Sequence, residues 1–455
     1  MSAPVPSFAE ATRTWTRIGL LSFGGPTGQI AVMHRILVDE KRWIGEERFL
    51  HALNYCMLLP GPEAQQLATY IGWLLHGTRG GLVAGTLFVL PGFVAILALS
   101  FVYVLWQGHT LVEGVLLGLK AAVIAIVIQA LIRIARRALK TALARTLALL
   151  AFAAIALLHA PFPIVIAVAG IAGYAAARRG FFLATEAHAQ RAPGDAAIPV
   201  VDAAAPTQAE PSVASHGAPS ARRAAKLLAL WLPLWLAPVL LAFLLLGAGH
   251  VFTQLGVFFS KMAVVTFGGA YAVLTYVAQQ AAGRYGWLTP AQMVDGLGLA
   301  ESTPGPLIMV VQFVGFLAAY QSAGADHALL AGVLGALITV WVTFVPCFLW
   351  IFLGAPYVER LREHRALAGA LAAITAAVVG VIANLALWFA LHVLFARVDP
   401  WSFGPLHVDV PHGMRWIPAA LTAFALLLLF VFKQSLARCL VASTLLGVLA
   451  TSTQL

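Results

Sequence analysis

Apolar stretches of about 20 residues recur along nearly the whole chain, separated by short polar or charged connections. A helix of that length can cross the hydrocarbon core of a bilayer. The pattern predicts an all-α polytopic membrane protein with about 13 apolar segments, of which about 10–13 span the membrane. Six segments lie at about 14–37, 49–76, 81–106, 110–132, 146–159 and 161–177, and seven at about 227–247, 251–281, 290–321, 327–354, 365–395, 415–432 and 434–452.

The composition supports this class, because only 10% of the 455 residues are charged and 61% are hydrophobic. Soluble chains carry roughly 25% charged residues, which are needed to cover a surface of this size. The net charge is +10, but the basic residues cluster between apolar segments, where they orient the chain in the membrane. We therefore expect the lipid bilayer, and no nucleic acid, as a partner.

Residues 180–226 are rich in alanine, proline, serine and glutamine, and this composition is typical of a disordered linker. The linker divides the chain into an N-terminal repeat, 1–179, and a C-terminal repeat, 227–455, which begins with one extra helix. The N-terminus has no short apolar region followed by a cleavage site, so we expect no cleaved signal peptide.

Motifs recur at a fixed spacing and indicate a tandem duplication. Two pairs are separated by the same 244 positions: Ser22–Gly25 (SFGG) with Thr266–Gly269 (TFGG), and Pro60–Pro62 (PGP) with Pro304–Pro306 (PGP). Trp43 and Trp287 also share the 244-residue spacing of these two pairs. The third pair, Lys120–Leu131 and Thr375–Ala386, is separated by 255 positions. Gln129 and Asn384 occupy equivalent positions in this third pair.

The second copy is predicted to be inverted in the membrane. Seven segments separate the starts of the two copies, and an odd number of spans reverses the orientation. The charges of the connections agree: 106–110 has no Lys or Arg, whereas its counterpart has Arg360, Arg362 and Arg365. The connection 38–48 disagrees mildly, because it should lie outside and yet carries three basic residues. We expect the N-terminus and the linker in the cytoplasm and the C-terminus outside.

Inverted repeats are typical of secondary transporters, whose substrates bind at the midplane where helices are broken by Gly or Pro. A channel is the alternative architecture, but no stretch resembles a selectivity filter. Proline ends one helix and suits the first position of the next, so each motif is expected to begin a half-helix. Helix N-termini attract anions. The candidate anion site therefore comprises Phe23–Gln29, Pro60–Gln66, Phe267–Tyr271 and Pro304–Met309, with glycines that could equally serve helix packing.

Three cations lie within apolar segments, where charge is costly and often functional. Arg17 and Lys261 are equivalent, each six residues before the phenylalanine of its motif. Both are candidates for contact with the anion or for snorkelling to the interface. Lys120 lies too far from either segment end to snorkel, so we expect an anion or a carboxylate beside it.

Two acids flank the proline motifs, and both are candidates for proton coupling or for structural pairing with a cation. Glu63 follows Pro62 directly, and Glu301 precedes Pro304 by three residues. Amide side chains near the motifs could donate to oxyanion oxygens: Gln29, Gln65, Gln66 and Gln312.

The stretches around these motifs resemble the chromate ion transporter (CHR) family in its long two-domain form. They are Ser22–Ile44, Leu58–Gly92, Thr266–Val277 and Gly298–Phe316. The resemblance implies export of chromate across the bacterial inner membrane, driven by the membrane potential or a proton gradient, and chromate resistance. Sulfate is implied as a competing or alternative substrate. The positions carried over are Gly24, Gly25, Pro26, Gln29, Pro60, Gly61, Pro62, Gln66, Phe267, Gly268, Gly269, Pro304, Gly305 and Pro306.

Motifs for other chemistry are missing from the sequence. It contains no HExxH, no GxSxG, no Walker loop and no dinucleotide fingerprint. The cysteines Cys56, Cys347 and Cys439 lie far apart, so we expect no metal site and no cofactor. The remaining alternatives are import of sulfate or another anion, and a membrane enzyme or sensor. A homodimer is left open.

Overall fold

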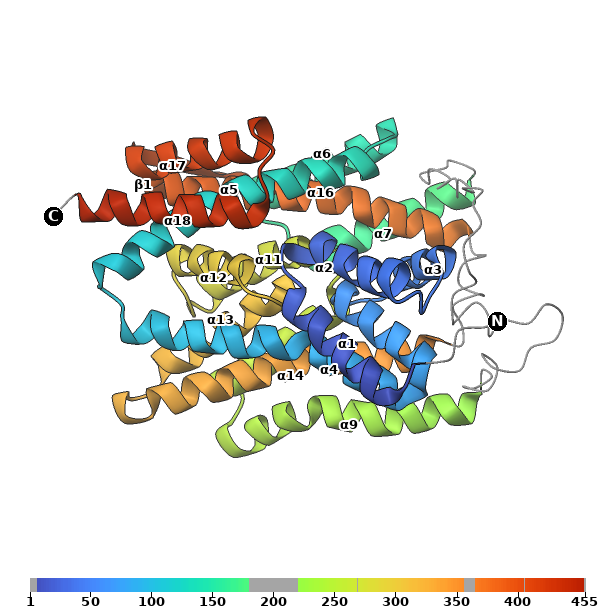
Figure 1. The fold of residues 1–455 in the computed structure, drawn as a ribbon. Coiled ribbons are helices and arrows are strands. Elements are labelled where there is room, and N and C mark those ends of the chain that lie inside the picture. Colours follow the sequence, from blue (N-terminus) through green and yellow to red (C-terminus); the bar gives the residue numbers. More distant parts are fainter. Residues whose placement is uncertain (1–5, 180–219, 268, 356–364, 405, 454–455) are drawn as a thin grey trace.

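The computed structural model describes residues 6–179, 220–267, 269–355, 365–404 and 406–453, and almost all of its elements are helices (Figure 1). Five helical stretches are long and apolar enough to cross a membrane: 63–105, 110–138, 221–246, 325–354 and 366–394. The prediction of a helical, multi-pass membrane protein is confirmed. The segment 356–364, with Arg360 and Arg362, lies outside the described residues, as does 180–219 of the expected linker.

The first copy folds into helices that begin and end close to its Gly and Pro motifs. They are α1 (Phe8–Leu21), α2 (Gly25–His34), the π-helical turn η1 (Arg35–Glu40), α3 (Glu46–Cys56), α4 (Glu63–Leu105), α5 (Thr110–Ala138), α6 (Ala142–Leu158) and α7 (Phe162–Arg178). Helix α4 is kinked at His76 and Gly77, so it consists of a short first part and a long second part.

The second copy repeats this series after the extra helix α9 (Ala221–Leu246). Its elements are α10 (Val251–Val265), α11 (Ala270–Ala278), η3 (Gln279–Arg284), α12 (Pro290–Ser302), η4 (Leu307–Met309), α13 (Val310–Ser322), η5 (Ala325–His327), α14 (Ala328–Gly354), α16 (Arg365–Leu394), β1 (Phe395–Phe403), β2 (Leu406–Met414), α17 (Trp416–Leu426), η7 (Leu427–Val431) and α18 (Leu436–Ser452). Even the π-helical turns η1 and η3 recur at the 244-residue spacing. Helix α9 begins six residues before the expected segment 227–247. Strands β1 and β2 form an antiparallel hairpin in the connection between the expected segments 365–395 and 415–432.

The first segment of each copy folds back at its FGG motif instead of crossing the molecule. In copy one, Glu40 at the end of η1 pairs with Arg17 of α1 at 2.9 Å, and Lys41 pairs with Glu10 at 2.8 Å. In copy two, the rings of Phe258 and Tyr276, from α10 and α11, lie 5.4 Å apart. Figure 1 shows α1 and α2 running to the same side from a shared tip.

The second segment of each copy folds back at its PGP motif in the same way. In copy one, the rings of Tyr55 and Tyr70 lie 5.3 Å apart across the motif, and His76 contacts the carbonyl of Pro6. In copy two, Gly296 of α12 lies against Phe313 of α13. Because two segments per copy turn back, the number of spans between the copies stays odd, and the parity argument for inversion is unchanged.

The tips of these hairpins meet at the centre of the molecule, where each copy binds the other through its backbone. The Gly61 N–H donates to the Thr266 carbonyl at 2.9 Å, and the Gly305 N–H donates to the Ser22 carbonyl at 2.8 Å. Gly61 corresponds to Gly305, and Ser22 to Thr266. The two bonds are therefore one contact made twice, as a pseudo-two-fold axis between the copies requires.

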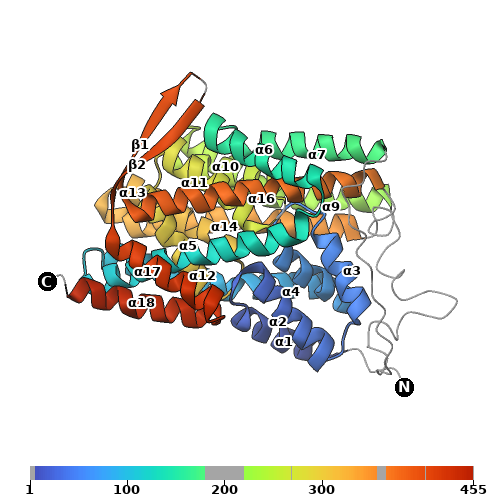
Figure 2. The same ribbon diagram turned by 90° about the horizontal axis from the view of Figure 1, so that it is seen from above.

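The remaining helices exchange partners between the copies. Helices α17 and α18 of copy two pack on α5 of copy one, while α6 and α7 of copy one pack on α16 of copy two (Figure 2). Small residues allow the close approach: Gly118 lies against the backbone of Ser443, and Gly173 lies against Gly369. Helix α9 lies on the outside with most of its leucines exposed.

Candidate functional site

A cavity of about 540 Å³ lies between the two copies, next to the tips of the FGG hairpins. Its wall is formed by the starts of α2, α4 and α11, the second half of α5 and the first part of α16. The polar or conformationally special residues in this wall are Gly24, Gly25, Thr27, Asn54, Glu63, Gln129, Arg133, Arg137, Gly269, Tyr271 and Thr375. Hereafter this is the basic cavity, after Arg133 and Arg137.

The basic cavity is lined by the N-termini of two helices, one from each copy. Helix α2 begins at Gly25 after Gly24, whose φ of +83° favours glycine, and α11 begins after Gly269, whose φ is +98°. A side chain added at Gly25 would come within 3.6 Å of the Tyr271 hydroxyl. The expectation that each motif begins a helix is confirmed, because helices also begin at Glu63 and Leu307. The N-terminus at Leu307 is buried away from the cavity.

Two arginines of α5 line the cavity, Arg133 and Arg137, and Arg133 lies one turn after Gln129. The Arg133 Nη2 donates to Gln129 Oε1 at 3.4 Å. In the sequence, Arg133 lies just after the fourth apolar segment, 110–132, and was not singled out as a site residue. The signal was present, since Gln129 had been singled out and residues four apart share a helix face.

Both predicted coupling acids lie at or beside the cavity. Glu63 is the first residue of α4 and lines the cavity. Glu301 is buried, and its Oε1 accepts a hydrogen bond from the Tyr271 hydroxyl at 2.6 Å. Tyr271 was not predicted as a functional side chain, although it follows the FGGA motif directly. Glu301 is thus held by the hydroxyl of Tyr271, which itself lines the cavity.

Three of the predicted glutamines already bond to backbone carbonyls. Gln29 donates to Gly305 at 2.5 Å, Gln66 to Pro60 at 2.7 Å, and Gln312 to Phe93 at 2.9 Å. Gln29 thus joins the hairpin tips of the two copies, Gln66 bonds within its own tip, and Gln312 joins α13 to α4; none of the three lines the cavity. Gln65 Nε2 is likewise bonded, to Thr69, and the side chain is fully buried. Asn384 is also buried and does not line the cavity.

The other motif positions divide into cavity-lining and structural groups. Gly24, Gly25, Pro26, Phe267 and Gly269 line the basic cavity. Pro60, Gly61, Pro62, Pro304, Gly305 and Pro306 belong to the central crossing and do not line it. Gly268 lies outside the described residues.

The three cations predicted from the sequence do not line the basic cavity. Arg17 is half exposed and pairs with Glu40, because the fold-back of η1 brings that carboxylate beside α1. Lys261 is exposed on α10. Lys120 Nζ lies 3.0 Å from Asp295 Oδ1, in a different cavity. The sequence expectation of a carboxylate beside Lys120 is met by Asp295, a residue that sequence reasoning did not single out.

Metal ligands do not gather in this region. Within the part of the chain that the structure describes, no group of three or more His, Cys, Asp or Glu side chains could hold a metal ion. The cavity therefore offers helix N-termini, a guanidinium, a hydroxyl and two carboxyls, which suit the binding of an anion and the movement of a proton.

Comparison with known proteins places the chain in a family. The family model described as chromate transporter matches residues 9–174 and 253–449, which include both copies. No solved structure is significantly similar to the chain.

Three curated relatives match most of the chain. The chromate transport protein of Cupriavidus metallidurans is 30% identical over 429 residues, covering 94% of this chain and 90% of the relative. The chromate transport protein of Pseudomonas aeruginosa is 33% identical, covering 83% and 80%. The probable chromate transport protein of Synechococcus elongatus is 27% identical, covering 84% of each. The chain therefore belongs to the chromate transporter family and is a membrane transporter, not an enzyme.

Proposed function

We propose that this protein exports chromate from the cytoplasm and thereby confers chromate resistance, with the basic cavity as the binding site. The observation that carries the proposal is the meeting of two helix N-termini, one from each copy, with Arg133 in one cavity. The family match supports chromate as the substrate. The names of the curated relatives support it as well.

The chemistry of the cavity suits a tetrahedral dianion. Free N–H groups at the starts of α2 and α11 carry partial positive charge, and the glycines let the ligand approach the backbone. The Arg133 guanidinium can donate two parallel hydrogen bonds to an oxyanion. Sulfate has the same charge and shape, so we expect it to compete. The cavity alone does not favour chromate over sulfate.

The charges around the cavity support a cytoplasmic opening. The α5 end that lines the cavity carries Arg136 and Arg137 in its last turn and is followed by Lys140 and Arg145, and α5 begins after a connection without Lys or Arg. The positive-inside rule assigns such a basic end to the cytoplasm. We accordingly propose that the N-terminus is cytoplasmic and the C-terminus external, in a bacterial inner membrane.

The membrane potential would drive export of a dianion. With the inside negative, each charge moved outward gains about 2.3 kcal/mol per 100 mV, so a dianion gains about 4.6 kcal/mol. Entry of protons through Glu63 and Glu301 would add to this driving force. Their place at the cavity supports both as coupling groups, because an anion bound there would favour their protonation.

The test is chromate accumulation in inverted membrane vesicles, whose exposed face is cytoplasmic. We expect energy-dependent accumulation that excess sulfate inhibits and that Arg133→Gln slows about tenfold or more. Accumulation of sulfate but not of chromate would mean that the protein is a transporter whose substrate is sulfate. Accumulation only in right-side-out vesicles would reverse the direction. No accumulation of either anion, by protein shown to be inserted, would contradict the proposal.

A further inference from the structure

A second polar cavity, of about 510 Å³, lies at the opposite end of α5 from the basic cavity. Lys120 lines it, and Arg133 of the basic cavity lies 13 residues, or about 20 Å, further along the same helix. Its polar lining comes from the end of α4 and the connection after it, from the start of α5, from α12 and from the end of α18: Tyr103, Gln107, Glu113, Lys120, Thr289, Gln292, Asp295 and Thr451. We call it the distal cavity.

The distal cavity is the repeat-related counterpart of the basic cavity. From α5, it is lined by Val112 and by four residues that have counterparts in the basic cavity, Glu113, Leu116, Leu117 and Lys120. The residues 255 positions later, Ala368, Leu371, Ala372 and Thr375 of α16, line the basic cavity. Helix α12 lines the distal cavity, and its counterpart α3 lines the basic one. In an inverted-repeat transporter, two cavities so related are the access routes from the two sides of the membrane.

An ion pair occupies the inner wall of the distal cavity. Lys120 Nζ lies 3.0 Å from Asp295 Oδ1, and the Tyr103 hydroxyl donates to Asp295 Oδ2 at 3.1 Å. The Asp295 side chain is only 4% exposed, while that of Lys120 is 23% exposed. The buried carboxylate therefore has two partners, and the cation still faces the cavity.

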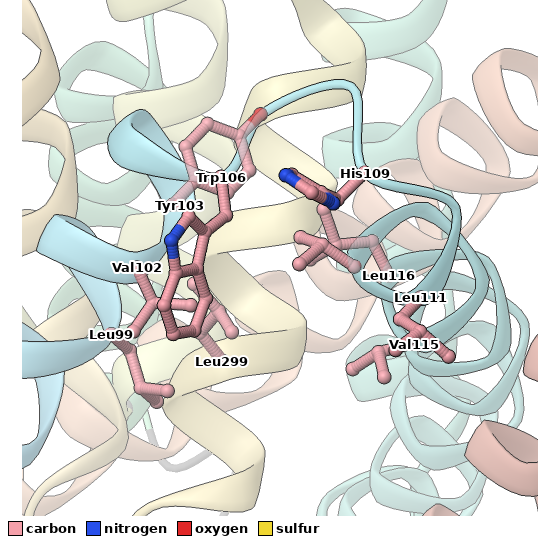
Figure 3. Close-up of a pocket in the computed structure, with 10 residues that line it drawn as sticks. Leu99, Val102, Tyr103, Trp106, His109, Leu111, Val115, Leu116 and Leu299 are labelled. Carbon is pink, nitrogen blue, oxygen red and sulfur yellow. The ribbon is translucent and has the colours of Figure 1, made fainter.

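Tyr103 contributes to the walls of two cavities. It lines the distal cavity and also an apolar cavity of about 350 Å³, which shares Val112 and Leu116 with it. Figure 3 shows this apolar cavity, with Tyr103 and Trp106 on one wall and Leu111, Val115 and Leu116 on the other. The Tyr103 ring also packs edge to face on Phe313, with the ring centroids 5.1 Å apart, and this contact holds its hydroxyl beside Asp295.

We propose that the distal cavity is the release vestibule for the transported oxyanion, and that Asp295 closes it by occupying Lys120. This inference rests on the proposed function. When the vestibule opens, the dianion passes to Lys120 and displaces the Asp295 carboxylate from it. When the ion pair re-forms, Asp295 displaces the dianion, which leaves to the outside. Asp295 thus prevents an unpaired lysine from trapping the anion on its way out.

The first test measures access to the vestibule without any substrate. A cysteine introduced as Leu117→Cys lines the distal cavity, while Cys56, Cys347 and Cys439 are buried, so the parent chain gives the background. We expect Asp295→Asn to raise the labelling of the cysteine introduced at Leu117 about fivefold or more, when intact cells are treated with a membrane-impermeant maleimide. The matched control Glu113→Gln removes a carboxylate from the same cavity and should leave labelling unchanged. Equal labelling of the introduced cysteine with and without Asp295→Asn would contradict the proposal that Asp295 closes the distal cavity.

The second test measures chromate transport in inverted vesicles. Asp295→Asn leaves Lys120 unpaired, so we expect both KM and kcat to fall about fivefold as the anion is held longer. Lys120→Met leaves a carboxylate facing the anion, so kcat should fall with KM unchanged or raised. In the labelling test, exchanging the two residues (Lys120→Asp with Asp295→Lys) should bring labelling of the introduced cysteine back to the level seen with the native ion pair. An unchanged KM in Asp295→Asn would contradict the role of Lys120 in release. Failure of the parent to transport would instead contradict the proposed function, because the labelling test needs no anion.

Discussion

The basic cavity and the distal cavity are built from equivalent backbone but carry different side chains. Arg133 faces the basic cavity from α5, and its equivalent in copy two is Trp388. Lys120 faces the distal cavity against Asp295, and its equivalent is Thr375. In the proposed mechanism, duplication supplied two access routes, and divergence gave one a cation that attracts an anion and the other a cation paired with Asp295. This difference favours capture at one end and release at the other.

The hairpin tips show the same divergence around a shared backbone. Gln29 and Glu63 of copy one correspond to Val273 and Leu307 of copy two. The reciprocal bonds of Gly61 and Gly305 nevertheless persist. The comparison thus separates positions that hold the two copies together from positions that handle the anion, and substitutions at each kind should differ in effect.

The largest effect is expected at the central crossing. A Cβ at Gly305 would lie 2.9 Å from the Gly92 backbone, and its φ of +99° disfavours any other residue. Gly305→Ala should therefore cost about 2–5 kcal/mol of stability from strain and overpacking. The measurement is the fraction of monodisperse protein remaining after heating in detergent.

Two further glycines provide matched controls. Gly269 shares the positive φ but has nothing within 4 Å, and Gly283 has neither constraint. We expect a loss of stability for Gly269→Ala that is smaller than for Gly305→Ala, and none for Gly283→Ala. Equal losses at Gly305 and Gly283 would show that the crossing is not a tight contact.

The next effect concerns the cation of the basic cavity. Hydrogen bonds to charged groups contribute about 1.5–3 kcal/mol, so Arg133→Gln should lower kcat/KM for chromate about 10- to 150-fold. Arg133→Lys should fall between the parent and Arg133→Gln, because lysine keeps the charge but loses the planar fork. Arg136→Gln, an exposed neighbour, is the control. A loss as large at Arg136 would indicate a general effect of surface charge.

The sequence predicted the broken helices and the repeat, because Gly and Pro motifs act locally and recur in register. It did not predict the hairpins, because an apolar stretch that turns back at the centre has the same composition as one that crosses. Asp295 and Tyr103 are separated by 192 residues. Arg133 resembled an ordinary connection charge, and only the packing of α5 against the hairpin tips brings it into the cavity. Long-range pairings of this kind carry no local signal.

A smaller effect is expected from the acid that lines the basic cavity. Glu63→Gln removes a negative charge near the anion, so KM for chromate should fall about threefold at neutral pH. If Glu63 carries the coupling proton, a pH gradient should no longer stimulate transport, while the membrane potential still should. Transport that keeps its full response to the pH gradient would exclude Glu63 and leave Glu301 as the coupling acid.

The smallest effect is expected at Lys261, where the sequence and the structure lead to different expectations. Its position six residues before the FGG motif suggested contact with the anion, but its side chain is exposed on α10, away from the basic cavity. Lys261→Gln should change KM for chromate less than about twofold, since an exposed charge at this distance is screened. Arg133→Gln, measured in the same vesicles, sets the scale of a cation that does face the anion. A loss at Lys261 comparable to that at Arg133 would mean that α10 turns this side chain inward during transport, and the basic cavity would then need a second cation from copy two.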